Sequence, residues 1–372
     1  MTPRRTGGIH GRAMPLAIPS PRALLDTGET LLIALAGGII FTFFGFPAGL
    51  VSGSVLAVAT AALLGRPTKV PLTLARVCYV IVGMLLGAVV TPQTVKGFTT
   101  WPASIALLMV AAVCMMVATT GYLRVVHRWD RLSALMGSSP GSMVQVIALS
   151  TELGADLRAI AIVQTVRVLL LTIGIPGGLA LFGLVAPAVP LARGSAGGSS
   201  LAELAVVIAV STATALAMAR LRFPGGLLFG AMAGSGVLHG TGLVQAVLPW
   251  WIGSASVLVL GAVVGSRFAN TPPRLIVGYI GAALGSFAIS LSIATVFALI
   301  VTHFFPFSIA NVVVAFSPGA QDTMMVLALA LHLDPVFVGA HHIARFLIVT
   351  FSIAIAARRI AKDEAPRGRP AR

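Results

Sequence analysis

The chain is dominated by long apolar runs, separated by short polar or glycine- and proline-rich stretches. A helix needs roughly 20 mostly apolar residues to cross the hydrocarbon core of a bilayer. The runs predict membrane-spanning helices near residues 29–46, 47–65, 73–91, 102–123, 159–185, 201–219, 224–240, 247–266, 275–301 and 335–357. Two further apolar segments, 132–155 and 308–331, are interrupted by Ser-Pro-Gly. The pattern predicts an all-α, polytopic transmembrane protein.

The two sets of runs match each other along the sequence. The segment Phe46–Leu50 recurs 177 positions later as Phe223–Leu227. At an offset of 178 the matches are Gly83 with Gly261, Gly87 with Gly265, Ser139-Pro140-Gly141 with Ser317-Pro318-Gly319, Asp156 with Asp334, and Arg167 with Arg345. A shared register of this kind predicts an internal duplication. The paired glycines at spacing four predict close helix packing.

The repeats and the charge pattern divide the chain into five parts. These are a basic tail (1–28), a first membrane repeat (29–190), a Gly/Ser linker (191–200), a second membrane repeat (201–357) and a second basic tail (358–372). The tails are expected to be cytoplasmic, because basic residues beside apolar runs remain inside.

Composition agrees with a membrane location. Hydrophobic residues make up 57% of the chain and charged residues only 9%, whereas soluble domains carry about 25% charged residues. The net charge of +15 lies mostly in short loops and tails. This is the pattern of the positive-inside rule, so we expect a bacterial-type plasma (inner) membrane protein and no direct contact with nucleic acid.

Loop charges also bear on the orientation of the halves. If each half crosses six times, the halves are parallel and six basic residues fall outside: Lys96, Arg158, Arg220, Arg222, Arg267 and Arg274. If 132–155 and 308–331 are re-entrant hairpins, each half crosses five times and the second half is inverted. Only Lys96 and Arg193 then lie outside, which favours the inverted arrangement. Each interrupted segment is nevertheless long enough to span, so both arrangements remain open.

The Ser-Pro-Gly breaks are the main candidates for function. Proline removes a backbone donor, and freed polar groups in lipid must be satisfied by protein or by a water-filled cavity. Matched breaks in two halves indicate a transporter's substrate site, and a structural kink is the alternative. The candidate substrate or ion site comprises Ser139, Pro140, Gly141, Ser142, Gln145, Ser317, Pro318, Gly319, Gln321, Asp322 and Thr323. Asp322 could bind a cation, carry a proton or pair with an arginine.

Six further residues are expected to support this site. Arg167 and Arg345 could pair with helix ends or carboxylates of the preceding segment, which is the favoured interpretation, or bind an anionic substrate. Asp156 and Asp334 are expected to cap the following helices. His341 and His342 point about 100° apart on a helix, so they do not converge on one metal.

No motif indicates an enzyme. Cys78 and Cys114 lie inside apolar runs and suggest no disulfide, and no Walker motif or glycine-rich dinucleotide turn occurs. We expect no metal, no cofactor and no enzymatic activity.

Short motifs in both halves resemble those of a known family. They are Ser139–Gln145, Leu153–Asp156 and Gln164–Arg167 in the first half, and Ser317–Asp322, Leu333–Pro335 and His341–Arg345 in the second. As a set they resemble the membrane AbrB duplication family over about residues 30–357. The resemblance implies Pro-Gly-Gly followed, after two residues, by Glu. Here that acidic position is neutral in both halves, at Gln145 and Thr323.

The resemblance implies two functions, and transport is not one of them. One is membrane-linked regulation of gene expression through a partner, and the other is an ammonia monooxygenase label that requires metal ligands. From the residues themselves we expect a secondary transporter for a small solute, with a proton or cation as the candidate coupling ion. Regulation is the alternative and an oxygenase the least favoured interpretation; a homo-oligomer is left open.

Overall fold

The computed structural model describes residues 20–90, 101–140, 143–186 and 200–364. Regular structure within these ranges is helical throughout, so the all-α prediction is confirmed for them. The helices are α1 (Pro21–Phe43), α2 (Gly49–Leu63), α3 (Leu72–Ala88), α5 (Trp101–Val125), α6 (Arg131–Ser138), α7 (Met143–Leu153), α8 (Leu157–Leu181), α9 (Leu201–Arg220), α10 (Gly226–Gly240), α11 (Trp250–Gly265), the short 3₁₀ turn η2 (Ser266–Phe268), α12 (Pro273–Phe304), α13 (Ile309–Phe316), α14 (Gln321–Ala330) and α15 (Pro335–Glu364).

Seven helices in the described ranges are long and apolar enough to cross a membrane, so this is a multi-pass membrane protein. They are α1, α5, α8, α9, α11 with η2, α12 and α15. The other three predicted spans are shorter, with 15 residues in α2, 17 in α3 and 15 in α10. Helices α2 and α10 start late because of the turn before each of them. In these turns Ala48 and Gly225 have positive φ values of 52° and 65°, which lie outside the right-handed helical region.

Two predicted boundaries need correction. Helix α1 begins at Pro21, eight residues before the predicted start, because Ser20 caps it by accepting a hydrogen bond from the amide of Ala23. Helix α15 continues to Glu364, past the predicted end at 357. The basic tails therefore overlap the helices at both ends. Of the predicted linker 191–200, only Ser200 lies within the described residues, where it caps α9.

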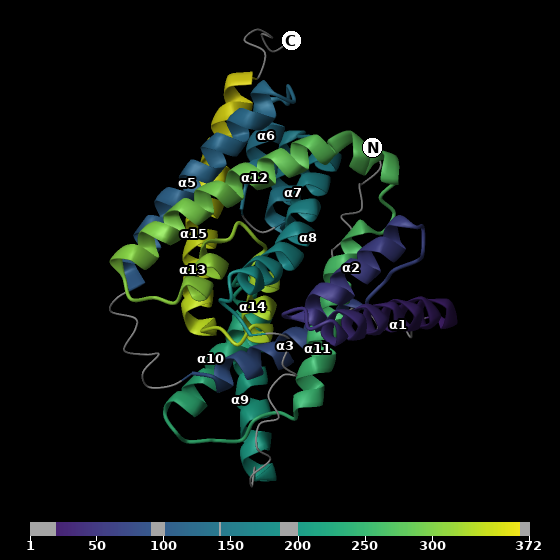
Figure 1. Cartoon of the computed structure of the whole chain (residues 1–372), viewed down its shortest axis with the longest axis vertical. Coiled ribbons are helices and arrows are strands. Elements are labelled where there is room, and N and C mark those ends of the chain that lie inside the picture. Colours follow the sequence, from purple (N-terminus) through teal and green to yellow (C-terminus); the bar gives the residue numbers. More distant parts are fainter. Residues whose placement is uncertain (1–19, 91–100, 141–142, 187–199, 365–372) are drawn as a thin grey trace, which may run out of the picture.

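Helices of the N-terminal half of the chain pack against helices of the C-terminal half at glycine residues. A Cβ on Gly87 of α3 would lie 2.5 Å from the carbonyl oxygen of Met232 in α10. A Cβ on Gly265 of α11 would lie 2.7 Å from the carbonyl oxygen of Val55 in α2. Only glycine allows backbones this close, so the predicted glycine packing is confirmed. Figure 1 shows α3 with α9 and α10 at one end of the molecule, and α2 with α1 and α11 at its side.

The longest helices form a second group. Helices α5 and α12 lie against each other, where the hydroxyls of Thr119 and Ser290 are 3.1 Å apart and Tyr122 donates to the carbonyl of Gly281 at 3.0 Å. As the number rises in α5 it falls in α12, so the two helices are antiparallel. Figure 1 shows this pair beside α13 and α15.

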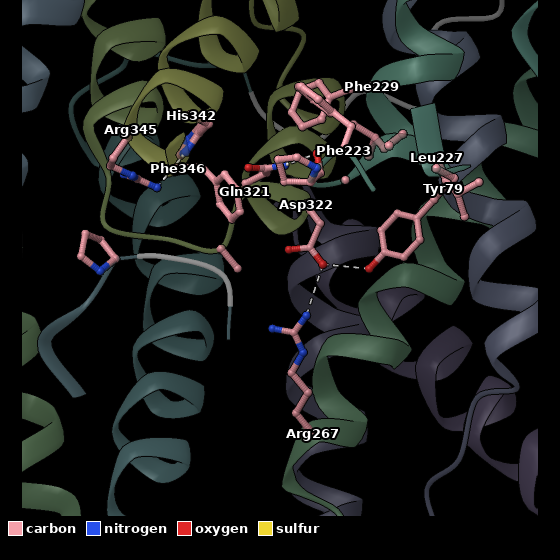
Figure 2. A pocket seen from close by; sticks show the side chains of 17 residues that line it. Tyr79, Phe223, Leu227, Phe229, Arg267, Gln321, Asp322, His342, Arg345 and Phe346 are labelled. Carbon is pink, nitrogen blue, oxygen red and sulfur yellow. Dashed lines mark hydrogen bonds and ion pairs between the residues drawn. The ribbon is translucent and has the colours of Figure 1, made fainter. Parts of the chain in front are cut away.

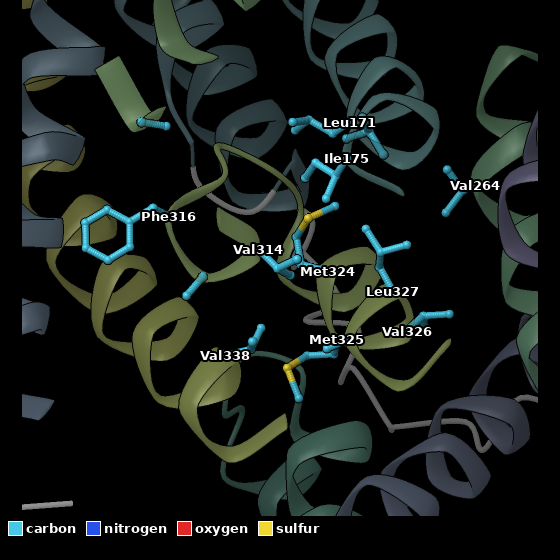
Figure 3. Close-up of a cluster of buried hydrophobic side chains, with 14 of the residues drawn as sticks. Leu171, Ile175, Val264, Val314, Phe316, Met324, Met325, Val326, Leu327 and Val338 are labelled. Atoms are coloured by element: carbon cyan, nitrogen blue, oxygen red, sulfur yellow. The ribbon is translucent and has the colours of Figure 1, made fainter. Parts of the chain in front are cut away.

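Helix α14 lies in the middle of the largest buried cluster. Its residues Met324 and Leu327 are fully buried, and Figure 3 shows them with Leu171 and Ile175 of α8 and Val338 of α15. Helices from both halves therefore fix the position of the second Ser-Pro-Gly break.

Candidate functional site

Both Ser-Pro-Gly sequences break a helix in two. Helix α6 ends at Ser138 and the backbone of Ser139 turns out of the helix. In the second half α13 ends at Phe316, and α14 begins at Gln321 after an extended stretch. Gly141 and Ser142 lie outside the described residues, as does the side chain of Gln145, whose backbone belongs to α7.

The two ends of each broken segment lie together. The amide of Asp156, after α7, donates to the hydroxyl of Ser133, near the start of α6, at 2.8 Å. The amide of Asp334, after α14, donates to Oδ1 of Asn311, near the start of α13, at 3.0 Å. Each segment therefore returns close to the point where it began.

Asp156 and Asp334 act as helix caps. Oδ1 of Asp156 accepts from the amides of Arg158 and Ala159 at 3.0 and 3.1 Å. Oδ1 of Asp334 accepts from Val336 and Phe337 at 2.9 and 3.1 Å. The predicted capping is confirmed, and neither residue lines the cavity between the breaks.

Arg167 and Arg345 bind the carbonyl groups at the breaks. Nη2 of Arg167 donates to Ser139 at 2.8 Å. Arg345 donates to the carbonyl of Ser317 through Nη1 and to that of Gly319 through Nη2, the latter at 2.9 Å. Both side chains are buried, with 4% and 1% exposure. The favoured interpretation, pairing with helix ends, is confirmed for these contacts, because the guanidinium groups replace donors that an unbroken helix would supply.

The adjacent histidines point to different partners. His342 contacts the carbonyl of Val314 through Nε2 at 3.1 Å and a guanidinium nitrogen of Arg345 through Nδ1 at 2.8 Å. His341 contacts the carbonyl of Phe337 and the hydroxyl of Ser104, both at 2.8 Å. The divergence agrees with the expected angle between neighbours on a helix.

A cavity of about 440 Å³ lies between the two breaks. It is lined by Pro140 from the first break and by Ala320, Gln321 and Asp322 from the second. The remaining lining residues come from α3, the end of α9, the α9–α10 turn, α10, η2 and α15: Tyr79, Ala219, Phe223, Pro224, Gly225, Gly226, Leu227, Leu228, Phe229, Arg267, His342, Arg345 and Phe346.

Several predicted site residues lie behind the cavity wall. Ser139, Ser317, Pro318 and Gly319 do not line the cavity. The Ser317 hydroxyl instead donates to the carbonyl of Val314 at 2.7 Å. These four residues shape the backbone at the breaks and do not form the cavity wall.

Asp322 is the centre of a polar cluster in this cavity (Figure 2). Its Oδ2 accepts from the Tyr79 hydroxyl at 2.8 Å and from Nη2 of Arg267 at 3.2 Å. Asp322 and Arg267 are partly exposed, with 30% and 22% side-chain exposure. The sequence suggested an arginine partner for Asp322 but gave no signal for which one. In the sequence Arg267 was noted only as a basic residue in a loop, and nothing in the sequence indicated Tyr79.

Three buried polar atoms near the cavity have no hydrogen-bond partner among the described residues: Oε1 of Gln321, Oγ1 of Thr323 and Nε of Arg345. Nε2 of Gln321 donates to the carbonyl of Pro224 at 3.2 Å, which ties the start of α14 to the α9–α10 turn. Thr323 lines a small adjoining cavity together with Tyr79 and Asp322.

Among the residues that the structure describes, no three or more His, Cys, Asp or Glu side chains gather where they could hold a metal ion.

Comparisons with known proteins point to one family. A family model described as transition state regulatory protein AbrB matches residues 50–361. A protein of Escherichia coli strain K12, named as a candidate regulator AbrB, is 25% identical over 91% of this chain and 96% of its own length. The uncharacterized protein YhjN of Bacillus subtilis strain 168 is 23% identical over 86% of this chain and 89% of its own.

Proposed function

The chain belongs to the AbrB membrane family, and from this premise we propose that it is a secondary transporter-like protein for a small solute. The family resemblance of its sequence motifs is confirmed. The observation that carries the proposal is the cavity that Pro140 and the stretch Ala320 to Asp322 line together. Matched helix breaks in two halves of a membrane protein favour a substrate site between them.

We infer that the chain contains two duplicated halves, because their polar contacts repeat at an offset of 178. The hydrogen bond between Ser133 and Asp156 corresponds to that between Asn311 and Asp334. The contact of Gln164 with the carbonyl of Met136 likewise corresponds to that of His342 with the carbonyl of Val314. Chance would not be expected to repeat such contacts in one register.

We infer that both broken segments are re-entrant hairpins. Helices α6 and α13 have 8 residues each, which corresponds to about 12 Å of length. This is less than half of the roughly 30 Å hydrocarbon core. Because each segment also ends beside its start, it would enter and leave by the same face. Five crossings would then remain in each half.

Helix directions support an inverted arrangement. Helix α5 and its counterpart α12 are antiparallel. A two-fold axis along the membrane normal would leave counterpart helices parallel, whereas an axis in the membrane plane reverses them. The reversal agrees with the loop charges, which place both tails inside. We therefore propose a bacterial-type inner membrane location with both termini in the cytoplasm.

Asp322 is the proposed coupling residue. Tyr79 on α3 and Arg267 on η2 both donate to its Oδ2. A proton or cation that reached this oxygen would compete with both donors. It would thereby loosen the attachment of α14, and of the second break, to the helices around it. The proposal includes no enzymatic step, no cofactor and no contact with nucleic acid.

Uptake into proteoliposomes tests the proposal. The full chain would be reconstituted and given sugars, amino acids, carboxylates and amines in turn, under a proton or a sodium gradient. We expect gradient-driven entry of one solute class, reduced at least about tenfold by Asp322→Asn, a cost of about 1.4 kcal/mol. The matched control is Asp26→Asn, whose carboxylate lies 4.0 Å from Lys69, outside the cavity. Absence of entry for every class, or equal entry with Asp322→Asn, would contradict the proposal.

Regulation of gene expression through a partner is the second candidate. The description of the family and the name of the Escherichia coli relative favour it. The basic tails 1–28 and 358–372 are the proposed docking segments. Deletion of 365–372 should then remove an effect on expression while solute entry continues; a regulator without transport would show the first effect and no solute entry at all.

A further inference from the structure

The positively charged side chains that line the cavity outnumber the negatively charged ones. Arg267 is paired with Asp322 at 3.2 Å. Arg345 has no carboxylate within ion-pair distance in the described ranges; its partners are two backbone carbonyl groups and the ring of His342. The cavity therefore holds one positive charge more than it holds negative charges. A buried charge without a counter-charge is costly.

His342 does not offset this charge. A guanidinium can only donate, so Nδ1 of His342 accepts from Arg345. The neutral ring, with its hydrogen on Nε2, then donates to the carbonyl of Val314. Both contacts are satisfied by the neutral form, which leaves the positive charge of Arg345 in place.

Two helix N-termini add positive potential. Helices α10 and α14 begin at the cavity, and their N-cap residues, Gly225 and Ala320, provide no side-chain cap. The first amides of a helix lack partners within the helix, and its dipole favours negative charge there. In α10 the amides of Gly226, Leu228 and Phe229 already donate to carbonyls of the preceding turn, so the start of α14 is the main source of this potential beside Arg345.

Unpaired buried atoms favour a bound ligand independently of the charge. Within the described ranges Nε of Arg345 has no hydrogen-bond partner, although the side chain is only 1% exposed and lines the cavity. Among the same residues Oγ1 of Thr323, 3% exposed, is also without a partner beside Asp322. Buried polar groups are rarely left unsatisfied, because each costs about 1–3 kcal/mol.

The walls of the cavity are largely apolar. Figure 2 shows Phe223, Leu227, Phe229 and Phe346 around the polar residues. The volume of about 440 Å³ falls within the range of small-molecule sites. An inorganic anion would leave these walls uncovered, and a cation would meet the excess positive charge.

We propose that the cavity binds a small organic anion. Its carboxylate group lies toward Arg345 and the start of α14, and its apolar body lies against Phe223 and Phe229. The identification of this anion as a transported substrate rests on the proposed function; the binding itself does not.

Thermal unfolding of the purified full chain in detergent tests the charge preference. The probes are benzoate, its neutral analogue benzamide and the cation benzylammonium, at constant ionic strength in sodium chloride. We expect saturable stabilisation by benzoate and none by the other two at the same concentration, because a ligand that binds only the folded state raises its stability. Equal stabilisation by all three would overturn the proposal.

Variants of the wall assign the binding to this cavity. Leu227→Asp adds a negative charge and should weaken benzoate binding at least about tenfold, or about 1.4 kcal/mol. Leu227→Asn has the same size and no charge, and should weaken it far less. Asp322→Asn removes a negative charge and should tighten binding several-fold. The exposed Arg66, paired with Glu29 away from the cavity, gives the control Arg66→Gln.

The outcomes separate this proposal from the transport proposal. Tighter benzoate binding by Asp322→Asn cannot result from misfolding. This variant therefore tests the anion site even if Leu227→Asp does not fold. Unchanged affinity in Asp322→Asn, or equal affinity in the two Leu227 variants, overturns the anion site. Benzoate binding without any solute entry into vesicles contradicts transport alone. Entry of neutral or cationic solutes without anion binding contradicts the anion site alone.

Discussion

At the scale of single residues, Arg167 and Arg345 satisfy the carbonyl groups that the two helix breaks leave without partners. Their shared register in the sequence indicated a common role, and the favoured pairing with helix ends could be stated from that alone. Their difference could not. Arg345 lines the cavity and Arg167 does not. This difference could not be predicted, because the cavity wall includes the α9–α10 turn, which lies far from both arginines in sequence.

Replacing Arg345 by lysine tests its structural contribution. A single ammonium group cannot reproduce the fork that reaches the carbonyls of Ser317 and Gly319. We expect a loss of about 1.5–3 kcal/mol of stability, the range for one hydrogen bond to a charged group. The measurement is the midpoint of thermal unfolding in detergent. Arg358→Lys, at an exposed pair with Glu152, should leave the midpoint unchanged; equal midpoints for both variants would refute the role given to Arg345.

At the scale of elements, each broken segment ends beside its own start, and a hydrogen bond joins the two places. The Ser-Pro-Gly breaks were evident in the sequence, since proline removes a backbone donor and glycine loosens a helix. Whether each segment spans the membrane or turns back within it was not evident, because 24 apolar residues are long enough for either. The contacts of Asp156 with Ser133 and of Asp334 with Asn311 are what bring the ends together.

Cysteine labelling tests the proposed path of the first hairpin. In a chain with Cys78 and Cys114 replaced by alanine, Arg131→Cys and Arg158→Cys would place thiols at its two exposed ends. A membrane-impermeant thiol reagent should label both in inside-out vesicles and neither in intact cells. Labelling of the two positions from opposite sides would mean that the segment spans the membrane. Ser308→Cys, at the start of the second hairpin, should show the opposite sidedness to both.

At the scale of the whole molecule, the halves are interlocked rather than placed side by side. Helix α3 of the first half packs on α10 of the second, and α11 of the second packs on α2 of the first. This arrangement places the second break against the α9–α10 turn and forms the cavity.

The position of the linker tests the inverted arrangement. With five crossings in each half, segment 191–200 lies outside; with six, it lies inside. A protease site inserted there should be cut when protease is added to spheroplasts, whereas a site appended to the C-terminus should survive. A protected linker would contradict the inversion, and a C-terminal site cut from outside would contradict the cytoplasmic terminus.

The sequence by itself determined the membrane class, most of the helices, the breaks and the caps, because each depends on residues close together along the chain. Apolar length predicts a span, the matched Ser-Pro-Gly sequences predict breaks, and Asp before a helix predicts a cap. Only the tertiary structure decided which side chains meet across the halves. Tyr79, Arg267 and Asp322 come from three helical elements, and the cavity joins them with Pro140 and Arg345. Such long-range contacts leave no period or motif, because they depend on how whole helices pack rather than on neighbouring residues.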